Sequence, residues 1–188
     1  TAENVIVVDG STTAWNGGWY VVNSNVTIDN RVTVSGEVHL ILADNASLTA
    51  NNGINVEEGN SFSVYAQSVG ENMGTLTATG QDDASIAGIG SEVGASCGTI
   101  TINGGNVTAT GGGSAAGIGG GKDSGSGGNI IIHGGTVKAT GGGLAAGIGG
   151  GNGGSGGTVT IHGGNVTASG GENAAGIGGG WKGSGGTI

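Results

Sequence analysis

The sequence contains no proline, one cysteine, four basic residues and very few aromatic residues. The lone Cys97 excludes a disulfide framework and a Cys-x-x-Cys metal site. Collagen is excluded because proline is missing and the 49 glycines do not fall at every third position. With aromatics at 3%, the core must be built from Val, Ile, Leu and Ala. No apolar run approaches the roughly 18–20 residues that a membrane-spanning helix needs.

Charge is sparse and unevenly distributed along the chain. Residues 1–97 hold eleven acidic residues and one basic residue, which gives −10. The remaining residues hold two acidic and three basic residues, which gives +1 and a total of −9. An acidic chain this poor in Lys and Arg is a poor candidate for binding nucleic acid or an anionic membrane. We therefore predict no nucleic-acid partner and no membrane insertion.

What the chain has in abundance is internal repetition. Three segments read GTITINGGNVTATGGGSAAGIG, GNIIIHGGTVKATGGGLAAGIG and GTVTIHGGNVTASGGENAAGIG, at residues 98–119, 128–149 and 157–178. Within them Val107, Val137 and Val166 recur at steps of 30 and 29 residues. A period of roughly 20–50 residues indicates units that bury their apolar side chains by stacking on their neighbours.

Each unit predicts three short strands with alternating apolar and polar residues, joined by corners of Gly and Asn. The first strands align Val26, Leu48, Leu76, Val107, Val137 and Val166. The second strands align Val32, Ile54, Ile89, Ile118, Ile148 and Ile177. The third strands align Leu40, Val64, Ile100, Ile130, Val159 and Ile188. We therefore predict an all-β, single-domain parallel β-helix of about six coils with three short strands per coil. We expect it to be right-handed, because crossover connections between parallel strands are almost always right-handed.

The pattern divides the chain into an N-terminal cap at residues 1–25, entry coils at 26–97 and Gly-rich repeat coils at 98–188. The cap region holds Trp15, Trp19 and Tyr20, which could close the first coil as a hydrophobic lid or form a sugar-stacking platform. The chain does not begin with Met and stops within a repeat. We therefore expect a processed or excised part of a longer parent chain with flanking domains.

The repeats differ most at one corner, between the second and third strands. The loops at residues 119–128, 150–157 and 179–186 keep their glycines and vary at the centre. The varying residues are the candidate ligand-binding residues: Lys122, Asp123, Asn152, Trp181 and Lys182. Variation on a constant scaffold is typical of recognition by repeat proteins, and a flexible solvated loop is the alternative.

His133 and His162 occupy equivalent positions in successive repeats, with Asn103 one coil earlier. Two imidazoles at a strand corner would make a weak metal site, so we expect stacked polar side chains on the outside. The nonapeptide calcium repeat GGxGxDxUx is not reproduced in any copy. We predict no metal site and no cofactor; calcium binding is possible but not indicated.

Catalysis on a polysaccharide would need clustered carboxylates, or bound calcium beside a basic residue. Asp82 and Asp83 lie in a corner insertion, and Glu57 and Glu58 lie one coil earlier, so these acids could approach one another. However, Arg31 is the only arginine, and most outward positions are Thr, Asn, Ser or Gly. We therefore assign no catalytic residue and do not expect an enzyme.

The units at 104–121, 134–151 and 163–180, of the form GGxVTATGGxxAAGIGGG, resemble Gly-rich β-helix repeats of modular secreted or cell-surface proteins of Gram-positive anaerobes. The stretch VSGEVHLILADNASLTANNGINVEEGNSFSVYAQS is similar to the entry coils of such modules. The resemblance implies a non-catalytic carbohydrate-binding or adhesion module of a larger secreted or surface protein, with a polysaccharide or glycan as partner. A structural spacer or stalk is one alternative. A β-helix polysaccharide lyase or glycoside hydrolase is another.

Overall fold

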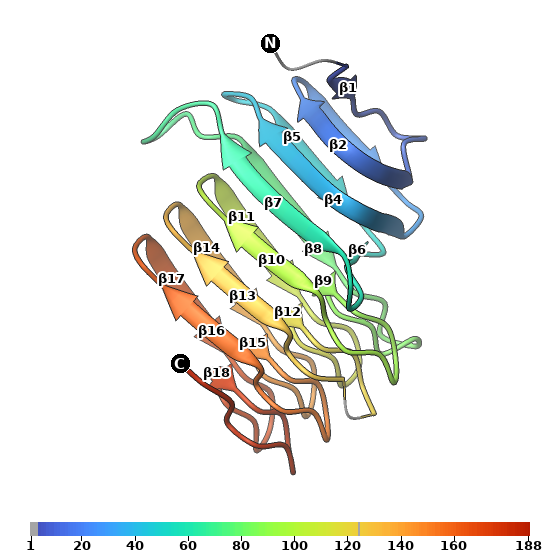
Figure 1. Ribbon diagram of the computed structural model, residues 1–188, viewed down its shortest axis with the longest axis vertical. Helices are drawn as coiled ribbons and strands as arrows, with labels where there is room; N and C mark the ends of the chain where they lie inside the picture. The colour runs from blue at the N-terminus through green and yellow to red at the C-terminus, as the bar shows by residue number, and fades with distance from the viewer. Residues whose placement is uncertain (1–3, 124) are drawn as a thin grey trace.

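The computed structural model describes residues 4–123 and 125–188, which form eighteen strands and no helix. Figure 1 shows the strands stacked along one axis, from β1 (Ile6–Val7) at one end to β18 (Ile177–Gly178) at the other. Every pair of neighbouring strands is parallel, as in a coil that returns to the same wall once per turn. Within the described residues no helix offers the length and apolarity needed to span a membrane.

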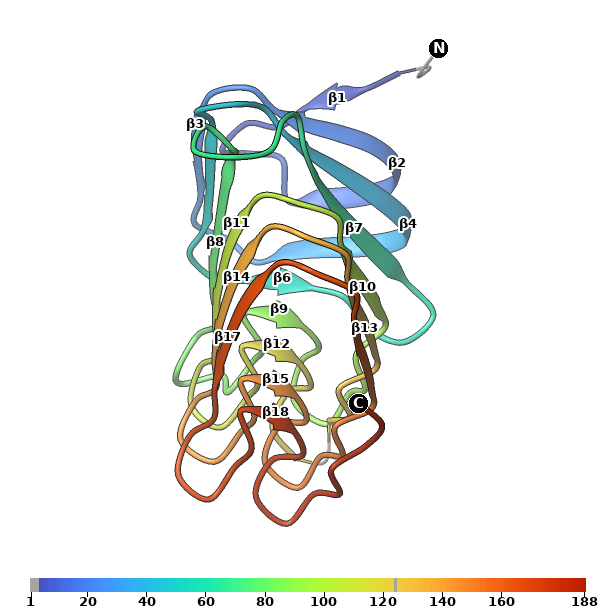
Figure 2. The ribbon, with the colours of Figure 1, turned by 90° about the vertical axis from the view of Figure 1, so that its left-hand side faces the viewer.

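The coil has three walls, which Figure 2 separates clearly. The first wall comprises β3 (Asn25–Ile28), β5 (Ser47–Ala50), β8 (Thr75–Thr79), β11 (Asn106–Thr110), β14 (Thr136–Thr140) and β17 (Asn165–Ser169). The second wall comprises the start of β4 (Val32–Leu42), then β6 (Ile54–Asn55), β9 (Ile89–Gly90), β12 (Ile118–Gly119), β15 (Ile148–Gly149) and β18. The third wall comprises most of β2 (Ala14–Val22), the rest of β4, β7 (Ser61–Ala66), β10 (Thr99–Ile102), β13 (Asn129–Ile132) and β16 (Thr158–Ile161). The first residues of β2 pair with the start of β4. The fold is therefore the predicted right-handed parallel β-helix with three strands per coil.

Pairing along the first and second walls follows the predicted columns. In the first wall, Val107 lies between Leu76 and Val137, and the column continues in both directions in the same register. In the second wall, Ile118 lies between Ile89 and Ile148. From β5 in the first wall and β9 in the second wall onward, each strand offers one bulky inward residue, so only one register stacks these residues on one another.

The third wall differs from the predicted column at one step. Val64 pairs with Ile102, and Ile100 pairs with Phe62, so the predicted Val64–Ile100 pairing is wrong by two residues. The pairing of Leu40 with Val64 and of Ile100 with Ile130 is as predicted. A shift of two residues leaves every side chain on the same face, so the alternation of apolar residues cannot distinguish the two registers.

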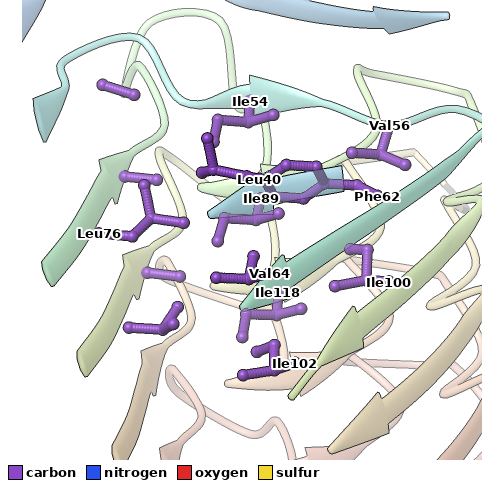
Figure 3. Close-up of a cluster of buried hydrophobic side chains, with 14 of the residues drawn as sticks. Leu40, Ile54, Val56, Phe62, Val64, Leu76, Ile89, Ile100, Ile102 and Ile118 are labelled. Atoms are coloured by element: carbon purple, nitrogen blue, oxygen red, sulfur yellow. The ribbon is translucent and has the colours of Figure 1, made fainter. Parts of the chain in front are cut away.

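The interior is filled by these stacked apolar columns, which Figure 3 shows pointing inward from all three walls. Among the largest fully buried side chains are Phe62, Leu40, Ile54, Ile89 and Ile118. Burying a side chain of this size contributes roughly 1.5–3 kcal/mol. The stack therefore supplies the core that a chain with few aromatics would otherwise lack.

The predicted cap at residues 1–25, whose first three residues lie outside the described residues, contributes to the same stack. Residues of β2 pair in parallel with β4, and β1 pairs with β2. Trp15 and Tyr20 are buried inside the coil, 5.3 Å apart between ring centroids, and Trp15 also contacts Phe62. These two aromatics therefore fill the end of the core, whereas Trp19 lies on the outside of the same strand.

The only arginine braces one corner between the first and second walls. The Arg31 guanidinium donates hydrogen bonds to the carbonyl oxygens of Asn52 (2.9 Å), Ala87 (3.2 Å) and Gly90 (3.1 Å), which come from the next two coils. Its Nε lies 3.4 Å from Glu92 Oε1. Burial lowers the pKa of Arg31 to about 10, which leaves the group charged at neutral pH. The coils become larger here: aligned first-wall residues are 22 apart from Val26 to Leu48 and 28 apart from Leu48 to Leu76. Arg31 is thus engaged structurally next to the first enlarged coil.

Candidate functional site

The outward side of the third wall carries an aromatic cluster. We call this surface, formed by the outward side chains of β2, β4, β7, β10, β13 and β16, the third-wall face; it is the side of the molecule seen in Figure 1. Trp19 and His39 pair across β2 and β4, and their rings stack 4.4 Å apart at 22°. Tyr65 lies 5.4 Å from Trp19 and 6.0 Å from His39 between ring centroids. Parallel pairing thus builds a cluster from three residues that are 20 and 26 positions apart.

His39 also brings polar ring atoms into this cluster. Its Nε2 lies 3.3 Å from Glu37 Oε1, while its Nδ1 is buried and has no hydrogen-bond partner among the described residues. The glutamate precedes it by two positions on β4, so both side chains are on the outward side. The cluster therefore combines flat apolar ring surface with polar atoms at its margin.

A second pair of rings lies further along the same face. His133 and His162 stack with 4.8 Å between centroids and 6° between planes, and both are exposed. They follow β13 and β16 directly, and Asn103 occupies the same place after β10. The expectation of outward, stacked polar side chains is confirmed here.

A polar hollow of about 470 Å³ lies where β7, β10 and β13 begin. Side chains that line it end in hydroxyl, amide or carboxylate groups: Glu58, Asn60, Ser61, Thr99, Ser126 and Asn129. Ser61, Thr99 and Asn129 are aligned in register on successive coils. The hollow therefore opens at one end of the third-wall face, a few residues along the strands from the level of Tyr65.

Cys97 lines the inner side of the hollow but is not reactive there. It is buried, and burial raises the pKa of its thiol from an ordinary value near 9 to about 12. The thiol is therefore protonated at neutral pH, and nucleophilic chemistry needs the thiolate.

Because the folded thiol has the higher pKa, we expect stability to fall between pH 9 and pH 12. In that interval only the unfolded chain releases the proton, so deprotonation favours unfolding by at most about 1.4 kcal/mol per pH unit. Urea unfolding followed across this interval should show a steeper loss for the wild type than for Cys97→Ala. Parallel pH profiles for the two proteins would contradict the assignment.

The predicted loop residues lie in one column at the corner between the second and third walls. The loop containing Asn152 and that containing Trp181 are joined by a hydrogen bond from Gly153 N to Trp181 O of 2.8 Å. Trp181 is 37% exposed, and the Lys182 ammonium lies 3.9 Å from the centroid of its ring. In the earlier coil Lys122 Nζ lies 3.9 Å from Asp123 Oδ1. The corner therefore presents different polar and aromatic groups on successive coils.

The acidic residues considered for catalysis are divided between corners. Asp82 and Asp83 lie between β8 and β9, where Asp82 Oδ1 accepts a hydrogen bond of 3.2 Å from Gly113 N. Glu57 and Glu58 lie between β6 and β7, at the next corner of the coil. Across residues 4–123 and 125–188, no group of three or more His, Cys, Asp or Glu residues is arranged to hold a metal ion.

Sequence reasoning did not single out His39, Tyr65 or the hollow. Alternation along β2 places Trp19 opposite to Tyr20, but it would put Trp15, four residues earlier, on the same side as Trp19. The irregular register between Asn16 and Gly18 reverses the alternation, so Trp15 points inward and Trp19 outward. Aligning β2 with β4 and β7 would have placed Trp19 beside His39. The hollow is lined by residues from three successive coils, which no local motif marks.

A family model described as a beta helix repeat matches the chain at residues 72–95, 100–122, 130–152 and 159–181. The four matches begin in the first enlarged coil and follow the stack to its last one. No curated protein matches the chain. No solved structure matches it either.

Proposed function

Because this chain carries four β-helix repeats, we propose that it acts as a non-catalytic carbohydrate-binding or adhesion module of a larger secreted or cell-surface protein. The glycan would lie on the third-wall face. The observation that carries the proposal is the outward ring cluster of Trp19, His39 and Tyr65 on the same face as a hydroxyl-lined hollow.

The ring cluster suits the apolar side of a sugar. A pyranose presents C–H groups on its faces and hydroxyls around its edge, and the indole and phenol rings provide large flat contacts of matching polarity. Parallel pairing on a rigid sheet fixes the rings before any ligand arrives. Such preorganisation reduces the entropy that is lost when the ligand binds.

The hollow suits the edge of a sugar. Its hydroxyl and amide side chains can both donate and accept hydrogen bonds, as a polyol requires. Ser63 and Thr101 continue the same polar surface along β7 and β10, and they pair in register. Neighbouring coils are about 4.8 Å apart. An extended glycan lying along the axis would therefore meet polar side chains of β7, of β10 and, through Asn129, of β13 in successive coils.

The corner loops form a second candidate contact. Trp181 offers a partly exposed ring, with Lys182 on it, and Lys122, Asp123 and Asn152 offer polar groups on the preceding coils. We propose that these residues contribute to glycan retention in addition to the third-wall face.

Replacing Trp181 by alanine is expected to weaken glycan retention about fivefold and to leave the fold intact. A half-exposed aromatic contact is worth about 1 kcal/mol, and the residue lies outside the buried columns. Affinity gel electrophoresis measures the retention, and the urea midpoint serves as the control for folding. Unchanged retention would remove Trp181 from the binding surface.

The general test is a glycan array read at several calcium concentrations. Binding to a defined set of glycans supports the proposal, and dependence on added calcium would show that an ion contributes. An array without any positive glycan would favour a structural spacer. Release of reducing ends or unsaturated uronides from a bound polymer would instead show a depolymerising enzyme.

A further inference from the structure

We propose that the third-wall face selects uncharged polysaccharides and disfavours anionic ones. This inference rests on the proposed function, because it names the class of glycan that the same face would take. It is carried by where the few charged side chains of this protein lie.

All four Lys and Arg residues of the chain lie away from this face or already pair with other groups of the protein. Arg31 is held by three carbonyl oxygens and Glu92 at the corner between the first and second walls. Lys138 lies on β14 in the first wall, and Lys122 and Lys182 lie in the corner loops. A uronate or sulfate on the third-wall face would therefore find no Lys or Arg to pair with.

Apart from the histidines His39, His133 and His162, the side chains on this face that can carry charge at neutral pH are carboxylates. Glu37 is at the start of the β4 segment that carries His39, and its side chain is 74% exposed. Glu58 lines the hollow and is exposed. Two like charges about 4 Å apart repel by about 1 kcal/mol in bulk water and by more near a protein surface. A carboxylated sugar placed between these glutamates would lose binding energy relative to its neutral counterpart.

The remaining side chains of the face favour neutral sugars directly. Most outward positions at the hollow and along the strands toward the ring cluster are hydroxyl- or amide-bearing: Ser61, Ser63, Thr99, Thr101 and Asn129. Ile131, which pairs with Thr101, is apolar. The hydroxyl and amide groups donate hydrogen bonds to sugar hydroxyls and accept hydrogen bonds from them, and neither partner carries a net charge. An anionic sugar would instead lose hydration without gaining a Lys or Arg to compensate its charge.

The experiment compares polymers that share a backbone and differ in charge. The pairs are hydroxyethyl- and carboxymethylcellulose, and methyl-esterified and de-esterified galacturonan, each cast into an affinity gel. We expect the wild type to be retained at least tenfold more strongly by the neutral member of a pair that it binds. The difference should narrow at about 0.5 M salt, because the Debye length then falls well below its value of about 10 Å at 0.1 M.

Variants make the charge argument specific. Glu58→Gln should raise the ratio of anionic to neutral retention about threefold. Asp83→Asn is the matched control, because it removes one negative charge from an exposed corner between the first and second walls. Asp83→Asn should leave retention on both the anionic and the neutral member unchanged. Equal or stronger binding of the anionic member by the wild type would overturn this inference and keep the proposed function. No retention by any glycan in the gels or on the array would remove the proposed function itself.

Discussion

Replacing Gly119 by alanine is expected to lower the free energy of unfolding by about 3 kcal/mol or more. Gly119 has φ +132, a backbone conformation that an L side chain rarely adopts, and such strain alone costs about 1–3 kcal/mol. A Cβ added there would also overlap the carbonyl oxygen of Gly149 in the next coil. Backbone, unlike a side-chain end, cannot move aside without breaking the pairing of β12 with β15.

Glycines with the same backbone conformation are aligned with Gly119 in the neighbouring coils. Gly90, Gly149 and Gly178 have φ +142, +131 and +134 and align with Gly119 along the second wall. The carbonyl oxygen of Gly149 also accepts a hydrogen bond of 2.8 Å from Gly120 N. A bulkier residue in one coil would therefore disturb the coil on which it is stacked.

Urea unfolding of the Gly119→Ala protein tests this expectation. Gly185→Ala is the matched control, because a Cβ at that position meets nothing within 4 Å and its φ is not in the strained range. We expect the control to keep the wild-type midpoint. A Gly119→Ala midpoint equal to that of the control would show that the close approach between the coils is not required.

The sequence alone was sufficient for the first and second walls, and the reason is physical. From β5 in the first wall and β9 in the second wall onward, each strand offers a single bulky inward residue, such as Val107 or Ile118, beside Ala or Gly. Only one alignment can then stack apolar groups without leaving a cavity. The tight glycine corners, where no Cβ fits, reinforce that alignment.

The third wall shows where this reasoning fails. There each strand carries two or more inward apolar residues, such as Phe62 and Val64 on β7. Either can be stacked on Ile100, and the choice depends on how the loop from β9 to β10 returns to the wall. The register of that return is a property of the whole coil, so the alternation within one strand cannot supply it.

The candidate site was less accessible to sequence reasoning than the fold. The repeat indicates as candidate binding sites the loops that vary between copies, including the loop with Trp181. The ring cluster lies instead in the first coils, where the repeat is weakest, and its members are recognisable only after strand pairing is known. Outward residues face no packing constraint that would reveal their position in a single sequence.

Replacing Trp19 by alanine is expected to weaken glycan retention about thirtyfold. The indole stacks on His39 and contacts Tyr65, so its removal takes away the centre of the flat surface that we propose for the sugar. Aromatic residues at the centre of a binding surface contribute about 2 kcal/mol or more, and each 1.4 kcal/mol is a factor of ten. Retention in affinity gels containing a glycan identified on the array measures the effect.

Trp19→Phe keeps a flat apolar ring and should retain most of the affinity. A purely structural role for the indole would instead lower retention equally in Trp19→Ala and Trp19→Phe. Thr108→Ala is the control for the opposite side of the molecule, since Thr108 points outward from β11 in the first wall. The urea midpoint of each variant reports on folding, because Trp19 is outside the buried columns and its loss should leave the stack intact. Full retention by Trp19→Ala, with the array glycan still bound, would move the binding surface from the third-wall face to another part of the coil.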